Sequence, residues 1–139
     1  MKRLLISILM SVAILSAISS CATVSKEPLA PGQLRLLRAS IPGSGLVYSG
    51  TDYDVNITFE ADGKPTIRRA CFYFSWSGEG PFCYAVRPKD VEFGPPGSLR
   101  VTLPPPGKTG PSRMDCFVEY WQGTKILRTN VIHSSIDAL

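Results

Sequence analysis

The sequence predicts an all-β domain, an antiparallel sandwich of seven to eight short strands after an N-terminal apolar segment. Short runs of β-branched, aromatic and other apolar residues recur along the chain, and Gly, Pro, Asp and Asn separate them. Several runs alternate apolar and polar residues with the period of two that a half-buried strand requires. After residue 20, no window of about eleven residues has the period of a helix.

The expected strands follow one another at short intervals. Segment 53–59 (YDVNITF) alternates most clearly, with its apolar residues on one face and its polar residues on the other. The centre of 67–76 (IRRACFYFSW) is apolar on both faces, which is typical of a central strand. The expected strands cover residues 33–41, 46–48, 53–59, 67–76, 82–91, 99–103, 114–121 and 126–132.

Turn residues connect these segments. Residues 77–81 (SGEGP) reverse the chain between 67–76 and 82–91, which predicts a hairpin. Residues 104–111 (PPPGKTGP) are expected to form a loop, because proline has no N–H to donate to a ladder. Gln122-Gly123-Thr124 is expected to join the last two strands as a hairpin.

This layout, over about residues 33–134, resembles that of immunoglobulin-like and fibronectin-like sandwiches. The resemblance implies two packed sheets, and a closed barrel of the same strands is the alternative. It is a resemblance of layout only. Three features of antibody-type domains are missing. Segment 53–59 has no cysteine to pair with Cys116 across the sheets, and Met114 stands where the tyrosine of a tyrosine corner would precede that cysteine. Trp76 falls at the end of its strand and not in the middle.

The first 21 residues carry the most specific motif. Lys2 and Arg3 precede an apolar run over 4–15, as in a secretory signal, and this run is shorter than the roughly 20 residues of a membrane-spanning helix. Ile18-Ser19-Ser20-Cys21 resembles the lipobox of bacterial lipoproteins. The resemblance implies that residues 1–20 are removed as a signal peptide and that acylated Cys21 anchors the protein in a membrane.

The same resemblance implies a location in the cell envelope. Ala22 after the cysteine favours the outer membrane, with the protein facing the periplasm. Residues 21–32, which include two prolines and a glycine, are expected to form a flexible tether, and residues 33–139 the sandwich domain. The formal net charge of +4 falls to about +2 without Lys2 and Arg3, which is too balanced to indicate nucleic-acid binding.

In an oxidising compartment, the three cysteines after Cys21 allow one disulfide. Cys71 and Cys83 flank the expected hairpin slightly out of register, and a small register change or bulge would bring them within diagonal reach. The alternative pair is Cys71 and Cys116, because their strands would be neighbours in an immunoglobulin-like layout. The cysteine spacings lack the close pair that is typical of zinc sites, so we expect no metal.

No catalytic or cofactor-binding motif stands out. His133, the only histidine, follows the last expected strand and is interpreted as a surface or edge residue near a flexible C-terminus. The pairs Asp52/Asp54 and Asp90/Glu92 lie beside turns, where solvated or capping carboxylates are usual. We therefore expect no enzyme activity, no catalytic residue and no cofactor.

Aromatic residues exceed what one face of each strand can bury, since six lie within 72–84 and three within 117–121. Rings exposed together are typical of protein or carbohydrate contact surfaces, and Tyr73, Tyr84 and Trp121 are the candidate binding residues. An extended core with cross-strand pairs would bury these rings instead.

The sequence predicts a lipid-anchored periplasmic module that binds or helps to assemble envelope components, with an envelope protein or a polysaccharide as partner. One alternative is a structural envelope lipoprotein without a dedicated ligand. A small envelope hydrolase is another.

Overall fold

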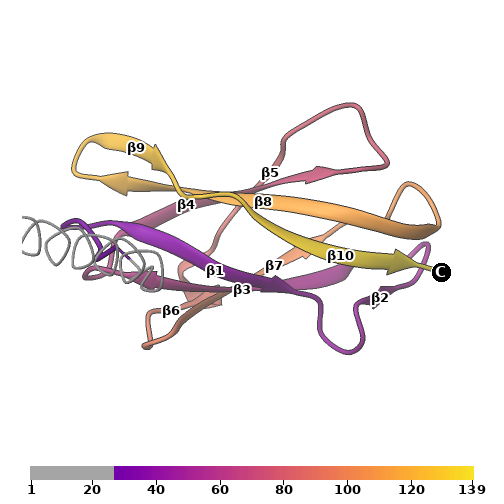
Figure 1. The fold of residues 1–139 in the computed structure, drawn as a ribbon, viewed down its shortest axis with the longest axis horizontal. Coiled ribbons are helices and arrows are strands. Elements are labelled where there is room, and N and C mark those ends of the chain that lie inside the picture. Colours follow the sequence, from indigo (N-terminus) through magenta and orange to yellow (C-terminus); the bar gives the residue numbers. More distant parts are fainter. Residues whose placement is uncertain (1–26) are drawn as a thin grey trace, which may run out of the picture.

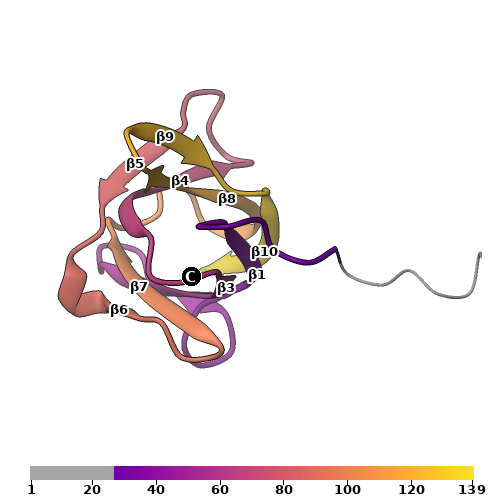
Figure 2. The same ribbon diagram turned by 90° about the vertical axis from the view of Figure 1, so that its left-hand side faces the viewer.

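A computed structural model describes residues 27–139, and the expected signal peptide, the lipobox and Cys21 lie outside the described residues. Two sheets pack against each other (Figures 1 and 2), with the strand orders β1-β3-β7-β6 and β2-β10-β8-β4-β5, and β9 pairs with β8. The strands are β1 (Leu34–Ser40), β2 (Leu46–Val47), β3 (Tyr53–Ala61), β4 (Thr66–Phe74), β5 (Phe82–Ala85), β6 (Val91–Glu92), β7 (Gly97–Leu103), β8 (Gly110–Gln122), β9 (Lys125–Arg128) and β10 (Ile132–Ala138).

This arrangement confirms the predicted sandwich and its immunoglobulin-like layout, rather than a closed barrel. The described residues form ten strands instead of seven or eight, because two predicted segments each divide. All pairings in this part of the chain are antiparallel except that of β10 with β2. No helix within residues 27–139 has the length and apolarity to cross a membrane.

The predicted strand 82–91 is the first that divides, and its two parts join opposite sheets. β5 ends at Ala85, and the short 3₁₀ helix η1 (Pro88–Asp90) leads to β6. Pro88 cannot donate to a ladder, and the side chain of Arg87 donates to Asp90 over 2.8 Å, so the chain turns here instead of continuing.

The C-terminal strands also extend beyond their predicted limits. β8 begins at Gly110, inside the predicted loop, and it tolerates Pro111 because this residue lies at the start of the strand, opposite Asp137. The predicted strand 126–132 is the second that divides. Its first part belongs to β9, residues 129–131 form a break, and residue 132 begins β10, which continues to Ala138. His133 therefore lies within a strand and not in a flexible terminus.

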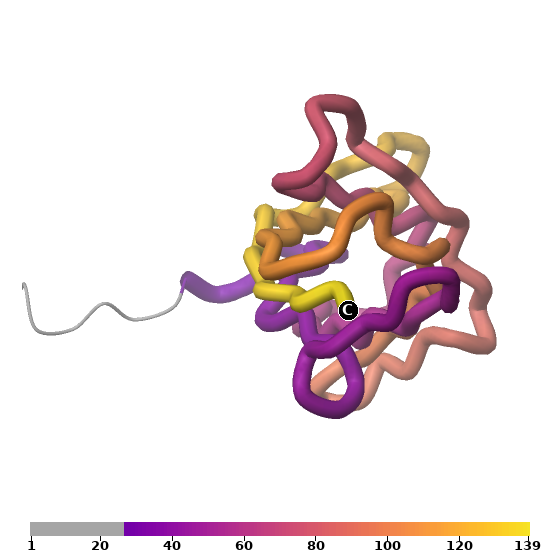
Figure 3. Tube along the Cα trace, turned by 90° about the vertical axis from the view of Figure 1, so that its right-hand side faces the viewer, coloured from indigo at the N-terminus to yellow at the C-terminus, as the bar shows by residue number. Residues whose placement is uncertain are grey.

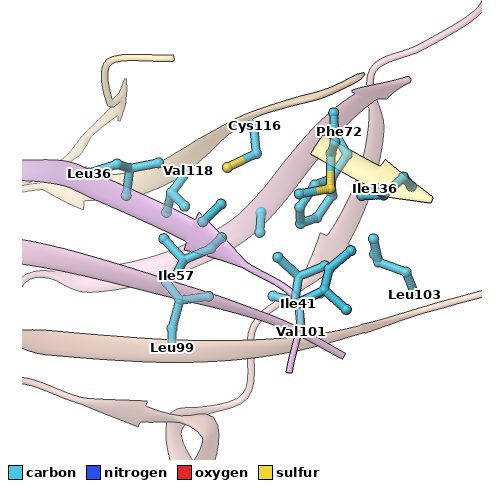
Figure 4. Packing of buried hydrophobic residues seen from close by; sticks show 14 of the residues in the cluster. Leu36, Ile41, Ile57, Phe72, Leu99, Val101, Leu103, Cys116, Val118 and Ile136 are labelled. Atoms are coloured by element: carbon cyan, nitrogen blue, oxygen red, sulfur yellow. The ribbon is translucent and has the colours of Figure 1, made fainter. Parts of the chain in front are cut away.

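The core lies between the sheets and follows the predicted alternation. Alternate residues of 53–59 and 99–103 are buried, and the polar residues between them are more exposed. Figure 4 shows Ile57 and Leu99 from one sheet facing Val118 from the other. The sulfur of Cys116 also points into this space, and the side chain is 1% exposed.

Two sets of hydrogen bonds fix the N-terminal part of the domain. The Asn130 side chain, in the break between β9 and β10, accepts from the backbone N–H of Leu36 over 2.8 Å and donates to its C=O over 3.0 Å. Residues 27–32, predicted as tether, also bond to the domain. The backbone of Gly32 donates to Asp62 over 2.8 Å, and Gln122 donates to the carbonyl of Pro31 over 2.6 Å. The described part of the predicted tether is therefore bonded to the domain.

Candidate functional site

The candidate site is the outer face of the sheet β2-β10-β8-β4-β5, the face turned away from the core. Cys71 of β4 and Phe117 of β8 lie opposite each other on this face. Both are at most 3% exposed, although neither belongs to the hydrophobic cluster between the sheets. The outer face thus has its own small buried layer.

A disulfide joins Cys71 to Cys83 on this face, which is the first of the two predicted pairings. The two residues are direct partners in the β4–β5 ladder, with Cα atoms 4.1 Å apart, and not offset from each other as the predicted register had placed them. The pairing of Cys71 with Cys116 is wrong, because Cys116 is a free thiol on the opposite side of the sheet.

A β-bulge in β4 turns two consecutive arginines toward the outer face. Ile67 pairs with Tyr120 and Arg69 with Glu119, so Arg68 is an extra residue without a partner in the ladder. In a regular strand, Arg68 and Arg69 would point to opposite faces. Here both side chains reach the same carboxylate on β8.

That carboxylate belongs to Glu119, whose side chain is 4% exposed. Arg68 Nη1 and Arg69 Nε each lie 2.7 Å from Glu119 Oε2, and Arg128 Nε of β9 lies 3.7 Å from Oε1. We call these four residues the arginine cluster. The hydrogen bond from Arg69, joined by that from Arg68, outweighs burial and keeps the pKa of Glu119 below its ordinary value.

The arginine cluster carries more positive than negative charge, because three guanidinium groups surround one carboxylate. The Arg68, Arg69 and Arg128 side chains remain 40%, 39% and 63% exposed. Each guanidinium has five N–H donors, so several point to solvent after Glu119 has been satisfied. The cluster can therefore accept a carboxylate or another anion from a partner.

Aromatic rings continue the surface beside the cluster. The Arg128 guanidinium lies over the ring of Phe117, with its Cζ 4.8 Å from the ring centroid, and the Tyr73 ring lies 6.3 Å from Phe117. Trp121 opposes Ile126 in the β8–β9 hairpin, and these two side chains are 38% and 43% exposed. Rigid rings and arginines thus occur together on one face.

A second polar group lies further along the outer face. Asp115 Oδ1 is 2.5 Å from His133 Nδ1 and accepts from Arg113 Nε over 2.8 Å. Burial alone would raise the pKa of Asp115, but the hydrogen bonds from Arg113 and His133 outweigh it and leave that pKa below its ordinary value. His133 is therefore tied into the sheet surface.

The three predicted binding residues do not form one surface. Tyr73 and Trp121 both lie on the outer face, at opposite ends of the paired parts of β4 and β8. Tyr84 points to the other side of the sheet, where its ring packs 6.1 Å from the core residue Phe72. Other rings of the aromatic group, such as Phe74 and Tyr120, are buried in the core.

The geometry does not assemble a cysteine–histidine pair. Cys116 pairs with Ile132, the residue before His133, but its thiol faces the core whereas His133 faces the outer surface. Burial, reinforced by the nearby Asp115 charge, raises the pKa of Cys116 to about 12, so this thiol is protonated at neutral pH. Among residues 27–139, no group of three or more His, Cys, Asp or Glu side chains is placed to hold a metal ion.

Sequence reasoning missed the arginine cluster. Two signals pointed to it, an Arg-Arg pair in an otherwise apolar strand and a glutamate inside the apolar run Phe117–Trp121. Charged residues in buried strands need partners of opposite charge, and here the arginine pair and the glutamate are partners of each other. No protein-family model matches the chain, and no curated protein matches it significantly.

Proposed function

We propose that this protein is a non-enzymatic binding module of the bacterial cell envelope, anchored by acylated Cys21 in the outer membrane and facing the periplasm. The observation that supports binding is the outer face, where arginine and aromatic side chains are held around the buried carboxylate of Glu119. Arginine, tyrosine and tryptophan are the residue types that contribute most to protein interfaces.

The charge of the face selects the chemistry of the partner. Three exposed guanidinium groups share one carboxylate, which leaves about two positive charges on the arginine cluster. The proposed partner is an envelope protein that presents Asp or Glu side chains to the cluster and an apolar patch to Tyr73 or Trp121. Salt weakens such an interaction, because its charges lie at a solvent-exposed surface.

The anchor limits where this face can lie. Only six residue steps separate Cys21 from Glu27, which begins the described part of the chain, and they span at most about 20 Å when fully extended. The start of β1 and the β8–β9 hairpin lie at this end of the domain (Figure 1). In the proposed arrangement, the arginine cluster therefore stays near the membrane and meets partners in the same membrane.

Site-specific photocrosslinking in cells tests the binding surface. A photoreactive residue at Tyr73 or Trp121 should give one dominant crosslinked envelope protein, and the same residue at Asn56 or Ser98, on the outer face of the other sheet, should not. Arg68→Glu with Arg69→Glu should weaken the crosslink. Equal yields from both faces, or products limited to abundant porins and lipoproteins, would contradict the proposal and favour the structural alternative.

The anchor is tested separately. Cells fed labelled palmitate should transfer the label to the wild-type chain and not to Cys21→Ala, and the variant should leave the membrane fraction. Label on the variant would show that the acylated residue is not Cys21.

A further inference from the structure

A cavity of about 170 Å³ opens at the end of the sandwich opposite residue 27, where β3 and β5 begin and β4 and β7 end. Figure 3 looks onto this end of the molecule. Aromatic rings and prolines dominate the lining, which includes Tyr53, Phe74, Trp76, Phe82, Tyr84 and Pro104. The volume lies below the range of about 300–1,000 Å³ for sites that enclose a drug-sized ligand, so the cavity suits a single ring.

One wall of the cavity is a fixed aromatic platform. The Trp76 ring stacks on Phe74 with centroids 4.5 Å apart and planes 6° from parallel, and the Phe82 ring lies 6.2 Å from Phe74. Because Phe74 belongs to the core cluster, the core supports the Trp76 ring. The platform therefore exists before any ligand arrives.

The polar side-chain atoms of the lining are without protein partners in the described part of the chain. Tyr53 is 8% exposed, and its hydroxyl has no hydrogen-bond partner among residues 27–139. No fully enclosed polar side-chain atom in that part of the chain lacks a partner, so the Tyr53 hydroxyl is in contact with solvent, and Tyr53 itself lines the cavity. The Tyr84 hydroxyl and the Trp76 indole N–H are likewise without protein partners in the described chain.

These polar atoms favour a ligand that is uncharged and carries hydrogen-bonding groups. A purely apolar ligand would leave the Tyr53 hydroxyl without a partner, which costs free energy in a mostly apolar cavity. No charged residue lines the cavity, so a charged ligand would find no counter-ion. Burial, and for Tyr53 also the nearness of Tyr84, raises the pKa of both phenols, so both stay neutral donors.

We propose that this cavity binds one ring of a neutral saccharide, with a C–H face of the pyranose against Trp76 and its hydroxyl groups bonded to Tyr53 and Tyr84. A pyranose has an apolar face and a polar edge, which is the combination that the lining offers. The proposal is independent of the outer face and of Cys21. A proline ring of a peptide would also fit an aromatic cavity, and its carbonyls could accept from the two phenols, but it has no hydroxyl group or N–H to donate back to the phenol oxygens.

Saturation-transfer NMR on the full chain, purified in a detergent without a sugar headgroup, tests the proposal. The probes are chitotriose and maltotriose, with a decaproline peptide for comparison. We expect saturable binding of at least one trisaccharide, with the strongest transfer to pyranose C–H protons. Failure of both trisaccharides to bind at millimolar concentration, or binding of decaproline alone, would overturn the proposal.

Variants locate the binding. Tyr53→Phe removes one hydroxyl and keeps the ring, and it should weaken saccharide binding about five- to tenfold, which corresponds to one hydrogen bond. Tyr48→Phe is the matched control, because Tyr48 is 61% exposed and lies outside the cavity. Trp76→Ala should abolish binding, and Tyr53→Phe keeps the test decisive if Trp76→Ala fails to fold. Equal effects of Tyr53→Phe and Tyr48→Phe would overturn the proposed site.

Discussion

Replacement of Gly97 by alanine tests the packing between β3 and β7. Gly97 opposes Phe59 in the ladder, and a Cβ at this position would lie 2.3 Å from Cε2 of the Phe59 ring and 2.5 Å from its Cζ. Non-bonded carbon atoms are most favourable at about 3.5–4.0 Å, so the added methyl group would overlap the ring by about 1 Å or more. The glycine is therefore required for space and not for backbone freedom.

The Phe59 ring cannot move away easily. It is fully buried and makes an edge-to-face contact with Phe93 at a centroid distance of 5.7 Å. Either β3 must separate locally from β7 or the ring must leave its rotamer, and overpacking of this kind costs about 1–3 kcal/mol. At roughly 4 °C per kcal/mol for a domain of this size, Gly97→Ala should lower Tm by about 4–12 °C.

Thermal unfolding followed by near-ultraviolet circular dichroism measures this effect. Gly78→Ala is the control, since a Cβ at Gly78 meets nothing within 4 Å. The smaller side chain of Phe59→Leu should relieve the overlap, so adding Gly97→Ala to that variant should cost less than it costs in the wild type. Unfolding of Gly97→Ala within about 1 °C of Gly78→Ala would refute the argument, because the ring would then have room to adjust.

Three further predictions concern ionisation and the cysteines. Because the hydrogen bond from Arg69 helps to lower the pKa of Glu119, its carboxylate stabilises the fold above its ordinary pKa and loses this effect as the pH falls through the lowered value. Glu119→Gln should therefore unfold at a lower temperature than wild type at pH 7, with a difference that shrinks toward pH 2; a constant difference would contradict this. Reduction of Cys71–Cys83, which are 12 residues apart, should remove about 2–3 kcal/mol of stability, and the double alanine variant should show no response to reductant in the same melting experiment. The Cys116 thiol should resist iodoacetamide at pH 8 in the folded protein and react in urea, as mass spectrometry would show; rapid modification of the folded chain would mean that the thiol is accessible.

The parts of the fold that the sequence predicts are those where the alternation is strong. Segments 53–59 and 99–103 each have one apolar face, and both are strands with that face in the core. The disulfide was also within reach of sequence reasoning, because a hairpin of known turn position brings Cys71 and Cys83 together. The exact register of the hairpin was not within reach, because a shift of one residue in the turn changes every pair of facing residues.

The missed features depend on tertiary context. β10 has polar residues at 133, 135 and 137, and its pairing with β8 along its length and with β2 at its end makes it a strand. The bulge at Arg68 leaves no mark on an alternation pattern except the Arg-Arg pair itself. The link between Asn130 and Leu36 spans 94 residues, a separation at which composition gives no signal.

The bonds from Asn130 to Leu36 have a consequence for how this domain can meet other chains. Sheets are vulnerable at their edges, where unpaired N–H and C=O groups invite strand addition and aggregation. Four of the five edge strands in the described chain are short, since β2 and β6 have two residues each and β5 and β9 have four each. β1 is the long edge, and there the Asn130 amide occupies both backbone groups of Leu36 beside a bulge. Strand addition therefore meets short edges, and on β1 it meets an occupied residue beside a bulge, which favours recognition through the side chains of the sheet faces and of the strand ends.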